Sequence, residues 1–201
     1  MTNLWTADAE DAWREALARY EAVVEEQGVA RLPELDRWYR DELPAAIAAR
    51  TQAHVTHAEL VRLTEWKMAR GVWRARNLAL VRGNDAALVE RTSAAALAKV
   101  PHPSAPIATL AELAGVGPAT ASGVASAAAP EVYPFFDELV AARIPGMEQV
   151  KFTPKEYARY SEALRDRAAR IGPAWTPTMV ERALWADTGG KAGLRTAKAK
   201  R

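Results

Sequence analysis

The stretch that most constrains this chain is Leu113-Ala114-Gly115-Val116-Gly117-Pro118-Ala119-Thr120-Ala121. One apolar pattern of helical spacing ends at this stretch and a second begins after it. Two helices joined so closely need glycine in the turn, because glycine adopts left-handed backbone without a steric cost. Pro118 suits the first position of a helix, where its missing amide hydrogen is not needed. We therefore predict a helix-hairpin-helix, with the hairpin motif over residues 107–129.

The remaining segments are also helical in pattern. Apolar residues recur at helical spacing over 8–27, and Thr56-His57-Ala58-Glu59 and Thr153-Pro154-Lys155-Glu156 have the capping-box pattern that opens a helix. Asn84-Asp85 predicts another helix start. No alternating strand pattern occurs. We predict an all-α fold of roughly ten helices in two lobes, forming one domain over residues 1–201.

Composition excludes several classes of protein. The chain of 201 residues has no cysteine, which removes disulfides, thiol nucleophiles and iron–sulfur clusters. No apolar run is long enough for a membrane span, and the first residues lack a signal-peptide core. No glycine-rich nucleotide loop is present, so a nucleotide cofactor is not expected. His54 and His57 have no evident third ligand, so a metal site there is not expected either. We expect a cytoplasmic monomer without a membrane partner.

The amino end of the second hairpin helix favours an anion. The first amides of a helix have no partner within it, and the peptide dipoles add to a partial positive charge there. We predict that the backbone of Gly115, Val116, Gly117 and Ala119 binds phosphate, and that Thr120 adds its hydroxyl. The alternative is a turn with a purely structural role.

Further cations lie in Trp66-Lys67-Met68-Ala69-Arg70-Gly71-Val72-Trp73-Arg74-Ala75-Arg76. Basic residues interleaved with tryptophan are typical of nucleic-acid binding, because cations hold phosphates and rings stack on bases. We predict Arg70, Arg74 and Arg76 as phosphate ligands and Trp66 and Trp73 as stacking candidates. The alternative places the tryptophans in the core and the arginines on a solvated face. At the other end of the chain, residues 190–201 form a basic tail without an acidic residue.

The hairpin, the helix after it and Asp137 together resemble the helix-hairpin-helix (HhH-GPD) DNA glycosylase superfamily over residues 107–142. Members of that family carry a hairpin of the type L-P-G-V-G-x-K-T-A and an essential aspartate at the start of the following helix. Asp137 lies eighteen residues beyond Ala119, which is the family's spacing. The resemblance implies a glycosylase-like fold, a DNA partner that places the protein on the nucleoid, and a monovalent cation. The implied cation ligands are backbone carbonyls of Ala111, Leu113 and Val116.

Departures from the family pattern limit the expected chemistry. Ala119 stands where glycosylases with lyase activity have a lysine, so no Schiff base forms at that position and we expect no lyase activity. Ala114 replaces the usual proline, and Asp137 follows two phenylalanines. The sequence thus predicts at most a monofunctional enzyme.

Asp137 is the candidate catalytic carboxylate. Cleavage of an N-glycosidic bond requires stabilisation of a sugar cation, and a carboxylate shielded from water supplies it. The aromatic residues before Asp137 are the candidates for that shield and for a base pocket: Tyr133, Phe135 and Phe136. The alternative is that Asp137 only caps its helix, accepting from the amide of Leu139 or Val140. Glu181, on the last predicted helix, is expected to order packing or to pair with an arginine.

Two main functions follow. The first is a monofunctional DNA glycosylase-like repair protein that hydrolyses the N-glycosidic bond of a damaged or modified base. The second is a non-catalytic helix-hairpin-helix protein that recognises DNA structure or damage. A helical module whose hairpin contacts another protein is a third.

Overall fold

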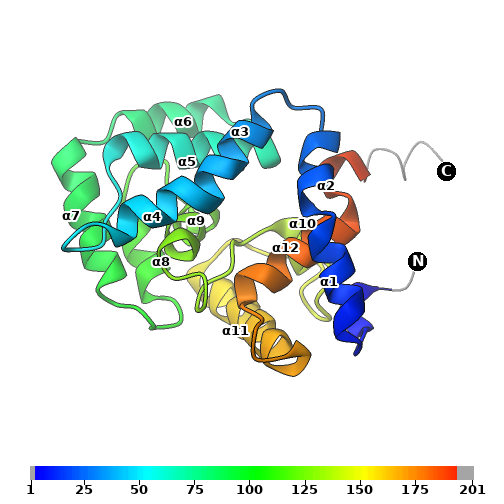
Figure 1. The fold of residues 1–201 in the computed structure, drawn as a ribbon. Helices are drawn as coiled ribbons and strands as arrows, with labels where there is room; N and C mark the ends of the chain where they lie inside the picture. Colours follow the sequence, from blue (N-terminus) through cyan, green and yellow to red (C-terminus); the bar gives the residue numbers. More distant parts are fainter. Residues whose placement is uncertain (1–2, 194–201) are drawn as a thin grey trace.

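The computed structural model describes residues 3–193, and these form helices and loops with no strand among them (Figure 1). The all-α prediction is confirmed. Two short helices, η1 (Leu4–Thr6) and η2 (Trp38–Glu42, a π-helical turn), accompany the α-helices. In chain order the α-helices are α1 (Glu10–Ala18), α2 (Tyr20–Glu26), α3 (Leu32–Arg37), α4 (Leu43–Ala48), α5 (His57–Arg70), α6 (Ala75–Arg82), α7 (Ala86–Leu97), α8 (Ala105–Leu110), α9 (Pro118–Ala128), α10 (Glu138–Ala141), α11 (Pro154–Ile171) and α12 (Pro177–Thr188). The single helix predicted over 8–27 is two helices, α1 and α2, which meet at Arg19.

The helices gather in two groups. Helices α3 to α9 form one group, in which α8 packs on α7 and α9, and α5 packs on α3, α6 and α9. The other group is built around α12, which contacts α1, α2, α10 and α11 (Figure 1). The two groups meet where α2 packs on α3 and where α8 packs on α11. One continuous set of buried residues forms the core of both.

Helix α9 is the central helix of the first group. Its alanine-rich sequence leaves small side chains on all sides, so α4, α5 and α8 approach it closely. At Gly123, an added Cβ would lie 3.1 Å from the Leu63 Cδ2 atom of α5. The Tyr39 hydroxyl donates to the Gly123 carbonyl at 3.0 Å. This packing fixes the position of the amino end of α9, where Gly117 is exposed and Pro118 is half-buried.

Several helix starts follow the predicted local signals. The capping box at Thr56 and Glu59 is complete, with both reciprocal bonds formed. At Thr153 only half of the predicted box forms: the threonine oxygen accepts from the Glu156 amide, but one Glu156 carboxylate oxygen is buried without a partner among residues 3–193. Asp85 caps α7 by accepting from the Leu88 amide at 2.8 Å.

Candidate active site

The turn between α8 and α9 (residues 111–117) is held against α6. Gly115 has φ of +76°, and a Cβ added there would lie 2.5 Å from the Asn77 carbonyl oxygen. Glycine is therefore required both by the backbone conformation and by the contact. The Asn84 side-chain amide forms two hydrogen bonds with the Ala114 backbone: it donates to the carbonyl at 2.9 Å and accepts from the amide at 3.0 Å. Asn84 was predicted only at the start of a helix, and its bonds to Ala114 were not predictable from local sequence.

The amino end of α9 is open. Gly117 is the N-cap residue and provides no side-chain oxygen, and Pro118 occupies the first helical position. Within residues 3–193 the amides of Gly117 and Ala119 donate no hydrogen bond. A Cβ added at Gly117 would meet no atom within 4 Å. The two unpaired amides leave the positive end of the helix dipole without a protein partner.

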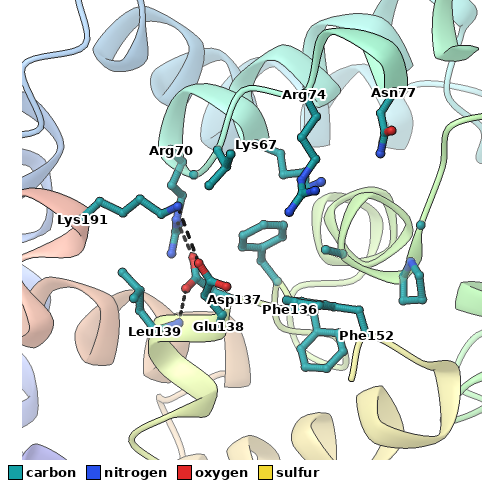
Figure 2. A pocket seen from close by; sticks show the side chains of 16 residues that line it. Lys67, Arg70, Arg74, Asn77, Phe136, Asp137, Glu138, Leu139, Phe152 and Lys191 are labelled. Carbon is teal, nitrogen blue, oxygen red and sulfur yellow. Dashed lines mark hydrogen bonds and ion pairs between the residues drawn. The ribbon is translucent and has the colours of Figure 1, made fainter. Parts of the chain in front are cut away.

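A cavity of about 240 Å³ lies beside this helix end (Figure 2). It brings together residues from both groups of helices. Its lining residues are Lys67, Arg70, Gly71, Val72, Arg74, Asn77, Gly117, Pro118, Ala119, Phe135, Phe136, Asp137, Glu138, Leu139, Phe152 and Lys191. Lys67 and Arg74 enter from the side of α5 and α6, and Asp137 and Glu138 lie opposite them (Figure 2). The cavity therefore combines cations, two carboxylates and aromatic rings.

Asp137 both caps α10 and lines the cavity. Its Oδ1 accepts from the Leu139 amide at 2.7 Å, as the capping alternative predicts. Its Oδ2 lies 3.3 Å from the Arg70 Nε, and the side chain is 11% exposed. The carboxylate is thus fixed in orientation and largely shielded from solvent, but it still faces the cavity (Figure 2).

Arg70 is a buried residue, which corrects its prediction as a phosphate ligand. It is 4% exposed, and its guanidinium makes a short ion pair with Glu181 and donates to the Tyr20 hydroxyl at 3.1 Å. The guanidinium also lies 4.3 Å from the ring centroid of Trp185. Burial by itself lowers the pKa of Arg70, but Glu181, Tyr20 and Asp137 together raise that pKa above its ordinary value. Arg70 stays charged and is occupied by protein groups.

Glu181, on α12, forms an ion pair with Arg70, which is one of the two roles predicted for it. Glu181, Arg70 and Asp137 together form a buried charge cluster. Burial raises the pKa of Glu181 to about 7, and the negative charge of Asp137 acts in the same direction, while Arg70 opposes both. One guanidinium faces two carboxylates, so it does not offset the desolvation of both. At neutral pH Glu181 is near its titration midpoint, and the charge of the cluster changes there.

The predicted aromatic residues separate into two sets. Phe135 and Phe136 line the cavity. Trp66 and Tyr133 are fully buried and do not, which corrects their prediction as base-pocket residues. Trp66 stacks on Tyr39, with ring centroids 3.6 Å apart, and donates to Asp36 at 2.9 Å. Tyr133 donates to the His102 carbonyl at 2.9 Å.

Two exposed residues of the basic segment stay outside the cavity lining. Trp73 is 56% exposed and lies in the loop between α5 and α6, and Arg76 is an exposed residue of α6. Arg74 is exposed as well and lines the cavity. Arg74 and Arg76 keep their side chains available for an anion, and Trp73 presents its ring to solvent.

Three of the predicted phosphate ligands do not line the cavity: Gly115, Val116 and Thr120. Thr120 is 1% exposed, so its hydroxyl is not presented to a phosphate, which corrects that prediction. The Val116 side chain is buried, and its amide donates to the Leu113 carbonyl at 3.1 Å, so this amide is not a free donor. Gly115 packs on α6 and does not line the cavity. The carbonyls of Ala111, Leu113 and Val116 remain a predicted cation site.

Two lysines line the cavity that were not predicted as site residues. Lys67 lies in the basic segment but was passed over for its arginines, and Lys191 was predicted only as part of the tail. The Lys191 Nζ lies 3.6 Å from a Glu138 carboxylate oxygen. The remaining tail cations, Arg195, Lys198, Lys200 and Arg201, lie outside the described residues.

Neither family models, curated proteins nor solved structures gave a match to this chain. No group of three or more histidine, aspartate or glutamate side chains suited to a metal ion occurs within residues 3–193. In the same range no helix has the length and apolar character needed to cross a membrane.

Proposed function

We propose that this chain binds damaged DNA and hydrolyses the N-glycosidic bond of a damaged or modified base, with Asp137 as the catalytic carboxylate. The observation that carries the proposal is the shared cavity. The unpaired amino end of α9 and the carboxylate of Asp137 line it together. One cavity would then hold a backbone phosphate at the helix end and the sugar beside the carboxylate.

The cations around the cavity support backbone binding. The amides of Gly117 and Ala119 provide two donors, and Arg74 and Lys67 add positive charge from the side of α5 and α6. Contacts to phosphate position a protein on DNA without reading the sequence. The exposed Arg76 extends the same charge along α6. The chain has a net charge of only +2, so this local arrangement matters more than overall charge.

The setting of Asp137 supports stabilisation of a sugar cation. Departure of the base leaves an oxocarbenium-like sugar, and a fixed negative charge nearby lowers the energy of that state. Asp137 is 11% exposed, so little water screens its field inside the cavity. Glu181 shares the charge of Arg70 with Asp137, since both carboxylates face the same guanidinium. A water molecule then completes the hydrolysis.

The aromatic wall supports an extruded base. Enzymes that act on a base take it out of the stack and hold it against apolar rings. Phe136 and Phe152 pack edge to face at the cavity, with ring centroids 4.8 Å apart. Phe152 is 39% exposed and so offers ring surface to a ligand.

Asp137→Asn tests the proposal, with Glu138→Gln as the matched control. Asparagine keeps the N-cap bond but removes the negative charge. Base release from a panel of damaged duplexes should be lost in Asp137→Asn, while DNA affinity is retained. Glu138 lines the same cavity and is about half exposed, so Glu138→Gln should release bases as the wild type does. Absence of release by the wild type across the panel, or release by Asp137→Asn at the wild-type rate, contradicts the enzyme proposal.

A non-catalytic DNA-binding protein is the second candidate. The ion pair between Arg70 and Asp137 favours it, because a guanidinium at 3.3 Å opposes the negative field that the sugar cation requires. Under this reading the wild type binds damaged DNA but releases no base. The same experiment therefore separates the two functions.

A further inference from the structure

A second cavity lies at the opposite end of α9 from the candidate active site. Its volume is about 180 Å³, and residues of η2, α4, α9 and α12 contribute to its wall. It has no lining residue in common with the first cavity. The proposed function makes no use of these residues, so the two cavities can be tested separately.

Two arginines give the second cavity its charge. Arg40 of η2 and Arg182 of α12 both line it, and their guanidinium carbons lie 5.6 Å and 5.9 Å from the ring centroid of Tyr20. The two cations are therefore held near each other around one ring. Like charges held in this way repel, and a bound anion offsets the repulsion.

The two arginines differ in their partners. The Arg40 Nε lies 2.9 Å from a carboxylate oxygen of Asp36, and its Nη2 lies 2.9 Å from one of Glu21. Arg182 has neither an ion pair nor a hydrogen bond among residues 3–193, and the carboxylate next to it in the chain is paired with Arg70. Arg182 is half-buried. Its guanidinium is thus the donor group that the second cavity offers to a ligand.

Apolar side chains form much of the remaining wall of the second cavity: Pro44, Ala127, Pro130 and Met179. An apolar cavity of about 150 Å³ holds a benzene molecule, so this cavity has room for a six-membered ring or a branched chain of similar size. One guanidinium matches one carboxylate, with which it forms two parallel hydrogen bonds. Inorganic phosphate would leave the apolar wall without a contact.

We propose that the second cavity binds a small monocarboxylic acid with an apolar body. The guanidinium of Arg182 holds the carboxylate, and the apolar wall surrounds the ring or chain. Arg40 adds positive charge but is unsuitable for substitution, because its removal would leave the buried carboxylate of Asp36 without a cation. Arg182 is therefore the residue whose substitution tests the site.

The test is a nuclear magnetic resonance titration of the isotopically labelled full chain with sodium benzoate. Benzoate should shift the backbone amide signals of residues 126–127 and 178–182 in a saturable manner. Benzyl alcohol has the ring without the charge, and sodium phosphate has charge without the ring. Both should bind at least about tenfold more weakly than benzoate at equal pH and ionic strength, because each lacks one of the two contacts.

Three variants test the roles of charge and shape. Arg182→Gln should weaken benzoate binding about tenfold or more, to the level of benzyl alcohol. Arg167→Gln is the matched control: Arg167 is also half-buried, lies 4.9 Å from the ring centroid of Trp5 and lines neither cavity, so its loss should leave benzoate affinity unchanged. Ala127→Leu fills the second cavity and should abolish binding. Thermal unfolding shows whether each variant is folded.

Saturable benzoate shifts at residues 126–127 and 178–182 that weaken in Arg182→Gln and persist in Arg167→Gln support the inference. An absence of saturable shifts overturns it, as do shifts confined to residues 117–119 of the first cavity. It is also overturned if phosphate or benzyl alcohol binds as tightly as benzoate, or if folded Arg182→Gln keeps the wild-type affinity. Base release and DNA binding enter none of these results, so the proposed function is tested separately.

Discussion

Glu181 is the carboxylate whose pKa the fold alters most among the described residues. Its carboxylate is buried beside Arg70 and Asp137, and its pKa is raised to about 7 from an ordinary 4.5. At a pH between these two pKa values, Glu181 is protonated in the folded chain and ionised in the unfolded chain. Stability contributed by this group is therefore present at low pH and is lost as pH rises through 7. At 1.36 kcal/mol per pKa unit, the loss is on the order of 3 kcal/mol.

Glu181→Gln should remove this pH dependence. Glutamine resembles the protonated carboxyl, so the variant should match the wild type at pH 5 and be at least as stable at pH 8. Urea unfolding between pH 5 and pH 8 measures it, with the wild-type free energy of unfolding falling over the range and that of the variant staying flatter. A wild-type stability that rises with pH, or an equal slope in both proteins, would refute the linkage.

At the scale of elements, the amino end of α9 allows stability and binding to be separated. Gly117 is an uncapped N-cap residue with ordinary extended backbone, and a Cβ there meets no neighbour. Aspartate and asparagine both cap better than glycine, by a few tenths of a kcal/mol. Aspartate in addition places a negative charge where the proposed phosphate lies.

We expect Gly117→Asp and Gly117→Asn to be as stable as the wild type or slightly more so, and Gly117→Asp to lose more DNA affinity than Gly117→Asn, because both caps occupy an amide of α9 but only aspartate adds a negative charge. Thermal unfolding and a binding titration at low salt check the two expectations. Equal affinity of the two variants would show that no phosphate lies at this helix end. Gly115 is unsuitable for the same experiment, because a side chain there would overlap the Asn77 carbonyl and destabilise the turn.

What the sequence predicted well was local. The caps at Thr56 and Asp85 depend on residues three positions apart, and both form. The burial of Arg70 was not predictable in this way, because its partner Glu181 lies 111 residues away on α12. Trp66 and Arg70 share one helix with Lys67, yet only the packing of α3 and α12 decides which side chains enter the core. Asp137, Gly117 and Ala119 were predicted as site residues and line the cavity, whereas its lysines were not predicted.

At the scale of the whole molecule, the basic tail (residues 190–201) has two parts. The structure describes it up to residue 193, and residues 194–201 lie outside the described range. Gln27 donates to the Gly189 carbonyl and accepts from the Ala192 amide, so the segment up to Ala192 is joined to α2. Lys191 in this segment lines the cavity. Truncation after Gly190 would therefore disturb the cavity as well as remove the tail. Residues 194–201 carry four further cations, Arg195, Lys198, Lys200 and Arg201.

Removal of residues 194–201 should reduce the salt dependence of DNA binding and leave base release unchanged. Each phosphate contact contributes about 0.9 to the slope of log K against log salt, because a bound cation releases condensed counterions. The slope should fall by about that amount for each contact that the tail makes. A full-length variant with these four cations changed to glutamine should show the same fall, because charge and not length is responsible. Identical slopes for all three proteins would assign the salt dependence to the cavity and α6 alone.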